Sequence, residues 1–421
     1  MTEKLQKTFF YISVGLAVLA YLFWTYFNFF AAEDANVLFN RFNHLREAPI
    51  FFYYAGYSSA FPQFIAFSLS WLPAALQAIL YSTVALLVFC ALLREIFLLT
   101  SSGLATVFTS AFCAVIYPAA IYNLTSSFWP GLAIVGLIGL RKSIQCTPFT
   151  WRDVLFCVPG ALGSPLAVVF FPLYFWISLS RRNAPSAVIS AMTLASYPLL
   201  ANHSSSRGEP GGLLTSLADN TSRMIVSPFD FAINRESIGD FVMSALGVAS
   251  IATIFTLGIS LLFKSNKTSE RIAFFLFLTG SLATFIISVA ASSVPLQGRY
   301  WFPVIVAAVS VTFYYFLSLG IHSALRRMQI LVVAMTGLAT VGTFAHRGQS
   351  WGGLQAGWSD WMLLASQAPS TTAIIRERHN DGGRWAIGIG SFDMNYAECS
   401  GSMQHPFSQE MFGFRIHCGE S

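Results

Sequence analysis

Long uncharged runs, separated by short polar loops, constrain this chain more than any other feature. Phe9–Phe30, Pro73–Leu93 and Phe241–Phe263 contain no charged residue, and each reaches the ~20 residues that a helix needs to cross a bilayer. Charged residues are 10% of the chain, against about 25% in a soluble domain. The sequence therefore predicts an all-α polytopic membrane protein.

The first run is too long for the apolar part of a signal peptide, and no small-residue cleavage site follows it. We therefore expect Phe9–Phe30 to be retained as the first span. The formal net charge is +5, but the basic residues are dispersed, so no nucleic-acid partner is indicated.

Basic residues mark the loops that we expect on the cytoplasmic side, because short cytoplasmic loops are rich in Lys and Arg. Placing these loops inside predicts a cytoplasmic N-terminus, an external loop at Ala31–Trp71 and a second external loop at His203–Asp240. It also predicts about eleven membrane segments, the last two of which are Phe302–Leu319 and Ile330–Phe344. The basic residues used are Lys4, Lys7, Arg94, Arg141, Lys142, Arg181, Arg182, Lys264, Lys267, Arg326 and Arg327.

The stretch Val154–Ser178 is long enough for one span, yet both of its ends are predicted to be inside. Its middle reads "VPGALGSPLAVVFFP", with Pro159, Gly160, Gly163 and Pro165 as helix breakers. We expect two short helices in a hairpin that reaches the outer side or stops partway. Irregular backbone at membrane depth requires surrounding protein or water, so we expect the hairpin to line a cavity.

The chain divides into a transmembrane domain, residues 1–345, and a small external C-terminal domain, residues 346–421. The tail lacks long apolar runs, and "GRWAIGIGSF" within it predicts a short strand. In an external, oxidising compartment Cys399 and Cys418 would form a disulfide; two free thiols are the alternative. No zinc-ligand spacing occurs, so no metal and no cofactor are expected.

Two adjacent acids, Glu33 and Asp34, follow the first span directly. In one interpretation Asp34 caps an interfacial helix, "ANVLFNRFNHL", that turns Arg41 towards water. In the other, a carboxylate at the edge of an external cavity serves as a general base, which must lie within hydrogen-bond reach of the proton it accepts.

A second group, "LQGRYWFP", precedes a late apolar run. Arg299 is either an interfacial arginine beside an aromatic belt of Tyr300 and Trp301, or a bidentate clamp on a phosphate, which suits guanidinium geometry. Aromatic residues also fill "YYAGYSSAFPQF", where Tyr54 and Tyr57 either pack on sugar faces or anchor the loop. His203 is best explained as a solvated loop histidine, although we include it among residues that could line a substrate site.

The stretches "AEDANVLFNRFNHL…YYAGYSSAFPQFIA" and "GALGSPLAVVFFPL", with the late "QGRY", resemble the GT-C superfamily of membrane glycosyltransferases. They are similar to its bacterial branch of O-antigen-modifying glucosyltransferases. The resemblance covers the layout of roughly the first 345 residues. It implies transfer of a sugar, such as glucose, from a polyprenyl-phosphate carrier to a cell-envelope glycan on the periplasmic side of the inner membrane. It assigns Asp34 or Glu33 as the base and places Arg299, with Gln297 and Tyr300, at the carrier phosphate.

Direct attack by an acceptor hydroxyl would invert the anomeric centre. A transporter or flippase of lipid-linked sugars is the main alternative. It is favoured by the broken helices near Pro159–Pro165 and disfavoured by the scarcity of ionisable residues in the middles of spans, where coupling sites usually lie. A polymerase or ligase of O-antigen is a third possibility, and a structural scaffold would leave the acid pair and the arginine unexplained.

Overall fold

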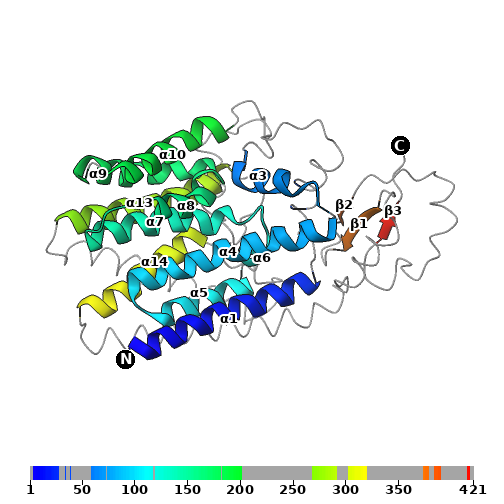
Figure 1. Ribbon diagram of the computed structural model, residues 1–421, viewed down its shortest axis with the longest axis horizontal. Coiled ribbons are helices and arrows are strands. Elements are labelled where there is room, and N and C mark those ends of the chain that lie inside the picture. The colour runs from blue at the N-terminus through cyan, green and yellow to red at the C-terminus, as the bar shows by residue number, and fades with distance from the viewer. Residues whose placement is uncertain are drawn as a thin grey trace.

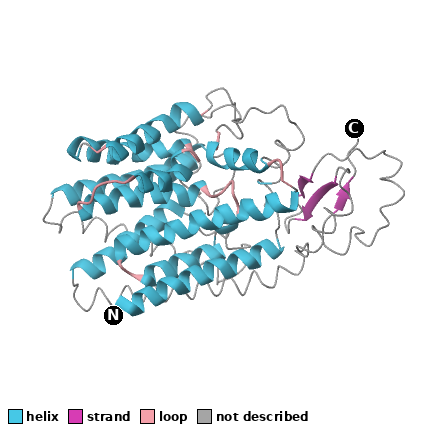
Figure 2. Cartoon of the chain, viewed as in Figure 1, coloured by secondary structure: helices cyan, strands magenta, loops and turns pink. Residues whose placement is uncertain are grey.

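The structure, a computed structural model, is a bundle of helices accompanied by a small sheet (Figures 1 and 2). It describes residues 3–27, 34, 38, 58–72, 74–116, 119–181, 183–201, 268–291 and 302–319, together with the strands 373–378, 384–389 and 415–417.

Three helices are long and apolar enough to span a membrane: α1 (Glu3–Phe27), α4 (Ala74–Thr100) and α13 (Thr268–Ala291). The predicted helical class is thus confirmed in its coarse form. Helix α14 (Phe302–Leu319) matches the boundaries predicted for a late span. Phe241–Phe263 and Ile330–Phe344 lie outside the described residues, so a total of eleven segments stays a prediction.

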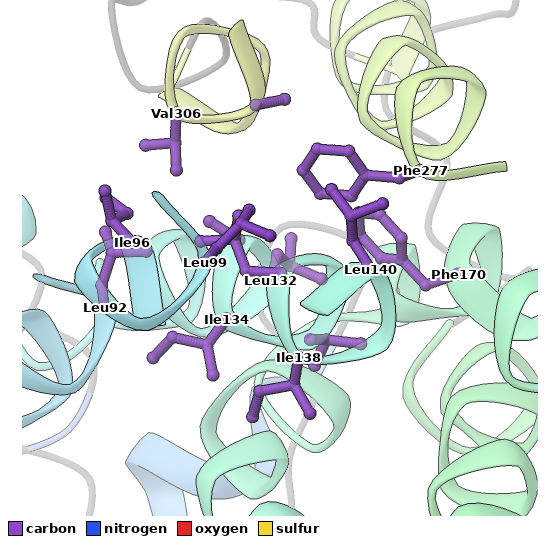
Figure 3. Close-up of a cluster of buried hydrophobic side chains, with 14 of the residues drawn as sticks. Leu92, Ile96, Leu99, Leu132, Ile134, Ile138, Leu140, Phe170, Phe277 and Val306 are labelled. Atoms are coloured by element: carbon purple, nitrogen blue, oxygen red, sulfur yellow. The ribbon is translucent and has the colours of Figure 1, made fainter. Parts of the chain in front are cut away.

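Helix α7 (Phe128–Gln145) is the centre of the bundle, and residues 128–143 are all buried. It packs against α4, α8, α13 and α14. Leucine and isoleucine side chains of α7 meet those of α4 on one side and Phe170 and Phe277 on another (Figure 3). The helix ends at Cys146, whose φ of 53° is left-handed, a conformation that commonly terminates helices.

The predicted hairpin is present as α8 (Trp151–Ala161), the 3₁₀ helix η2 (Pro165–Phe170) and α9 (Phe171–Arg181). The helices break at residues 162–164, where the Ser164 side chain accepts a hydrogen bond from Leu166 N and Pro165 begins the next turn. Pro159 and Gly160 were predicted as breakers, but both lie inside α8. Gly160 is needed for close packing instead, because a Cβ on Gly160 would clash with the backbone carbonyl of Gly131 in α7.

The remaining helices complete the bundle. Helix α3 (Ala60–Leu69) lies within the segment predicted as the first external loop. Asn183 caps the start of α10 by accepting from Ser186 N at 3.3 Å, as short polar side chains do at helix N-termini. The other helices are α5 (Gly103–Ile116), α6 (Ala119–Tyr122) and α10 (Ala184–Leu200).

The C-terminal tail contributes a three-stranded antiparallel sheet in the order β2-β1-β3. Its strands are β1 (Ala373–Arg378), β2 (Arg384–Ile389) and β3 (Arg415–His417). Strand β2 falls within the predicted "GRWAIGIGSF". Cys399 and Cys418 lie outside the described residues, so their disulfide stays a prediction.

Candidate functional site

The Asp34 carboxylate is buried, with 2% of the residue exposed, and it binds a turn 90 residues further along the chain. Its Oδ2 accepts from Leu124 N at 2.8 Å, and its Oδ1 accepts from Thr125 N and Thr125 Oγ1, both at 2.7 Å. The capping interpretation placed this side chain at the start of its own helix. The hydrogen bonds that the structure describes join it to the turn that precedes α7, and the capping interpretation stays a prediction because residues 35–37 lie outside the described residues.

That turn consists of Asn123–Ser127 and is stabilised by hydrogen bonds between its own residues. Asn123 Oδ1 accepts from Ser126 N at 3.1 Å and from Thr125 Oγ1 at 2.5 Å. Ser127 Oγ donates to Leu124 O at 2.6 Å. Side chains of this kind commonly stabilise turns through the backbone, so the turn presents two backbone N–H groups and one hydroxyl to Asp34 in a fixed arrangement.

The tip of the α8–α9 hairpin lies beside the same turn. A Cβ on Gly163 would lie 2.5 Å from Phe128 Cβ, at the start of α7. Ser59 Oγ donates to Gly163 O at 2.8 Å, and Phe61 N donates to Leu162 O at 3.0 Å. The hairpin therefore reaches the Asp34 end of the bundle. Residues at the start of α3 donate hydrogen bonds to the backbone carbonyl groups at its tip. Whether it also lines a cavity stays a prediction.

Helix α4 brings Tyr81 to this end of the bundle. Tyr81 is fully buried, interacts electrostatically with Asp34 and donates from its hydroxyl to Gln77 Oε1 at 3.3 Å. Gln77 Nε2 in turn donates to Leu72 O at 2.7 Å. The first turns of α4 and the residues before them thus form one wall of the Asp34 site.

A second polar cluster ties together α4, α7 and α8. Arg141 donates to Glu95 Oε2 from Nε at 2.9 Å and lies 2.8 Å from it through Nη2. Nη2 also lies 3.4 Å from Asp153 Oδ1, and Lys142 Nζ lies 3.0 Å from Asp153 Oδ2. Arg94 pairs with the other oxygen of Glu95. This ion-pair cluster is largely buried, so the charges neutralise one another away from water.

The cluster corrects one prediction. Arg94, Arg141 and Lys142 were expected in loops, yet Arg94 lies within α4 and the other two lie within the buried part of α7. The reason is pairing: Arg141 and Lys142 meet carboxylates on neighbouring helices, and Arg94 pairs with the adjacent Glu95 of α4. A single segment of sequence cannot show the contacts between helices.

Asp153 connects the cluster to the start of α8. It forms a capping box with Thr150, accepting from Thr150 N at 2.7 Å and from Thr150 Oγ1 at 2.8 Å. Burial raises the pKa of this carboxyl, but the donors on Thr150 and the neighbouring Lys142 outweigh burial and leave the pKa below its ordinary value. Asp153 is thus held ionised as a structural group.

The Asp34 site and the ion-pair cluster lie at opposite ends of the bundle. Asp34 contacts the turn just before α7, and Arg141 follows Ser127 by fourteen residues, which is about 21 Å of helix. Hydrogen bonds from Gly103 N to Gln6 Oε1 and from Gln145 Nε2 to Leu98 O gather the start of α1 and the ends of α4 and α7 at the cluster end.

Of the predicted site residues, the structure describes Asp34 alone. The others lie outside the described residues, and their proposed roles stay predictions: Glu33, Arg41, Tyr54, Tyr57, His203, Gln297, Arg299 and Tyr300. The sequence did not lead us to assign Asn123 and Thr125 to the site. Their signal was the polar tract "NLTSS" between two apolar runs, at the end predicted to be external.

The described residues contain no group of His, Cys, Asp and Glu side chains that could hold a metal ion. No known family model, curated protein or solved structure matches this chain.

Proposed function

We propose that this protein is an integral membrane glycosyltransferase that uses a polyprenyl-phosphate-linked sugar. The observation that carries the proposal is the Asp34 carboxylate, buried and oriented by three donors at the end of the bundle away from the ion-pair cluster. A general base needs such a fixed acceptor. Its place just after the first span agrees with the residues through which the sequence resembles the GT-C superfamily.

The distribution of charge supports an external position for Asp34. Hydrogen bonds gather the start of α1, the end of α7 and the α7–α8 loop at the cluster end. The α9–α10 turn joins them, because Asn183 Nδ2 donates to Phe149 O at 3.2 Å. If basic ends face the cytoplasm, Asp34 faces the periplasm. The basic residues at the cluster end are Lys4, Lys7, Arg94, Arg141, Lys142, Arg152 and Arg181.

In the proposed reaction the carrier phosphate binds at the external interface, where Arg299 compensates the charge of the leaving group. Such electrostatic stabilisation often contributes more to catalysis than any other effect. An acceptor hydroxyl attacks the anomeric carbon, the bond from that carbon to the phosphate oxygen breaks, and Asp34 takes the hydroxyl proton. Attack from the face opposite the phosphate inverts the anomeric centre. The acceptor is a cell-envelope glycan such as O-antigen.

Reconstitution tests this function. The purified full-length chain in liposomes receives a polyprenyl-phosphate sugar, with glucose as the first choice, and an O-antigen acceptor. Transfer that depends on the protein supports the proposal. If no sugar is transferred but labelled carrier moves between the leaflets, the protein is a flippase instead.

The flippase alternative is favoured by Glu95, an ionisable residue buried within a candidate span. Coupling sites typically lie near the bilayer midplane, whereas Glu95 lies in the last two turns of α4. Its carboxylate is also ion-paired with Arg141 and Arg94. We therefore regard the ion-pair cluster as a structural tie and keep transfer as the proposed activity.

A further inference from the structure

The Thr125 hydroxyl contacts two acceptor oxygens, but when Asp34 is ionised only one hydrogen is present among the three oxygens. The Thr125 hydroxyl lies 2.7 Å from Asp34 Oδ1 and 2.5 Å from Asn123 Oδ1. A hydroxyl has a single hydrogen to donate, so it can point to only one of these two oxygens at a time.

The orientation of the Asn123 amide is fixed independently. Ser126 N donates to Asn123 Oδ1 at 3.1 Å, so turning the amide would set an NH₂ group against a backbone N–H. Asn123 therefore presents an acceptor to Thr125. When the Thr125 hydrogen points to Asn123, the short contact with Asp34 Oδ1 is favourable only if Asp34 carries a proton.

Thr125 is more exposed than the two residues that its hydroxyl contacts, Asp34 and Asn123, which are both buried. Asp34 is 2% exposed, whereas Thr125 is only partly buried. Thr125 thus stands between the carboxylate and the surroundings of the turn, and its hydroxyl touches Asp34 directly.

We propose that Thr125 relays protons to Asp34, and that the side chain of Asn123 receives the Thr125 hydroxyl once Asp34 is protonated. This inference rests on the proposed function, in which Asp34 accepts the proton of an attacking hydroxyl. As the new carbon–oxygen bond forms and the sugar–phosphate bond breaks, the acceptor proton passes to Thr125 Oγ1. The original Thr125 hydrogen passes to Asp34 Oδ1, and the new Thr125 O–H turns to Asn123 Oδ1. Protons and charge balance in this step, and the heavy atoms of the three relay side chains stay in place.

The relay sets the pH at which Asp34 titrates. Ionised Asp34 gains a charge-assisted bond from Thr125, and such bonds are stronger than neutral ones. Protonated Asp34 depends on Asn123 to receive the Thr125 hydrogen. Among the described residues, Tyr81 of α4 also interacts with Asp34 electrostatically.

Infrared spectroscopy of the full chain in liposomes tests the relay without requiring transfer activity. The probe is the carbonyl band of protonated Asp34, identified by its loss in Asp34→Asn and followed as a function of pH. Thr125→Val should raise the midpoint by about one pH unit, because only the ionised form loses a charge-assisted bond. Asn123→Ala should lower the midpoint, because the protonated form loses the acceptor for the Thr125 hydrogen.

Two controls separate the relay from general damage to the turn. Thr125→Ser keeps the hydroxyl and should keep the midpoint. Ser127→Ala removes the bond to Leu124 O, which lies outside the relay, and should also leave it unchanged. Shifts of the same sign in Thr125→Val and Asn123→Ala, or no titrating band from Asp34, would overturn the relay. Opposite shifts in a protein that transfers no sugar would keep the proton relay and reject the glycosyltransferase. Transfer activity without these shifts would keep the glycosyltransferase and reject the proton relay.

Discussion

Thr125 contacts the same oxygen of Asp34 twice, through its backbone N and through its Oγ1, each at 2.7 Å from Oδ1. The two residues are 91 positions apart, so this contact fixes the segment after the first span against the turn before the central helix. It makes Asp34 both a structural link and a well-oriented carboxylate at its end of the bundle.

The proposed orientation predicts an external C-terminus. A reporter that is active only in the cytoplasm, fused after Ser421, should stay silent, because that placement keeps the predicted basic loops inside. The same reporter fused before Glu3 should be active and provides the matched control. Activity at the C-terminal position would show that the topology is wrong by one span.

Arg299 is predicted to act on the carrier phosphate. Arg299→Ala should reduce the use of the polyprenyl-phosphate donor by more than it changes the thermal unfolding midpoint. Arg299→Lys should restore only part of the activity, because an ammonium cannot reproduce two parallel hydrogen bonds. The measurements are kcat/KM for the donor and unfolding in detergent. Unchanged kcat/KM in both variants would leave Arg299 as an interfacial residue.

The ion-pair cluster predicts strong non-additivity. Arg141→Met leaves Glu95 buried beside a single remaining partner and should destabilise the protein by about 3–5 kcal/mol. The double variant Glu95→Leu/Arg141→Met should cost clearly less, because the buried carboxylate is removed together with its buried partner. Arg94 also loses Glu95, but its side chain is 33% exposed and can be hydrated. Thermal unfolding compares the two variants.

Lys7→Met supplies the surface control for that comparison. Lys7 and Glu3 pair at 2.7 Å with both side chains well exposed, and exposed pairs contribute little. The unfolding midpoint should therefore not change. Additive losses from Glu95→Leu and Arg141→Met would show that the two side chains do not stabilise the fold as a pair.

Close backbone packing between α7 and α8 makes Gly131 sensitive to substitution. Gly131→Ala adds a Cβ that would lie 2.5 Å from Gly160 N, so the helices must separate, at a cost of about 1–3 kcal/mol. Gly15→Ala is the matched control, since a Cβ there meets nothing within 4 Å and should stabilise α1 by about 0.5–1 kcal/mol. Equal unfolding midpoints for the two variants would contradict the packing.

The sequence predicted those parts of the fold that depend on one segment alone. The length of the last described apolar run predicted α14 with its observed ends. Gly163 and Pro165 predicted the break between the two helices of the hairpin. What depends on contacts between distant segments was missed. Arg141 was assigned to a loop because short cytoplasmic loops are rich in Lys and Arg, and its partners Glu95 and Asp153 lie on other helices.

The Asp34 site shows the same limit. The acid pair after an apolar run was visible in the sequence, so Asp34 was identified as a candidate. Its partners Leu124 and Thr125 act mainly through backbone N–H groups, which every residue except proline carries and which no sequence pattern distinguishes. Glu33 lies outside the described residues, so the choice between Glu33 and Asp34 stays a prediction.

The transfer rate of Asp34→Asn tests the role of Asp34 as the base most directly. Asparagine keeps the shape but can accept with only one oxygen, so Leu124 N would lose its partner and the protein should be destabilised by about 1–3 kcal/mol. Glu33→Gln is the adjacent control, and both proteins are compared at a temperature where each is folded and inserted. If Asp34 is the base, Asp34→Asn lowers the rate at least about 10²-fold while Glu33→Gln has a smaller effect. Mild and equal losses at both positions would contradict the base role and leave Asp34 as a structural link between the first loop and the turn before α7.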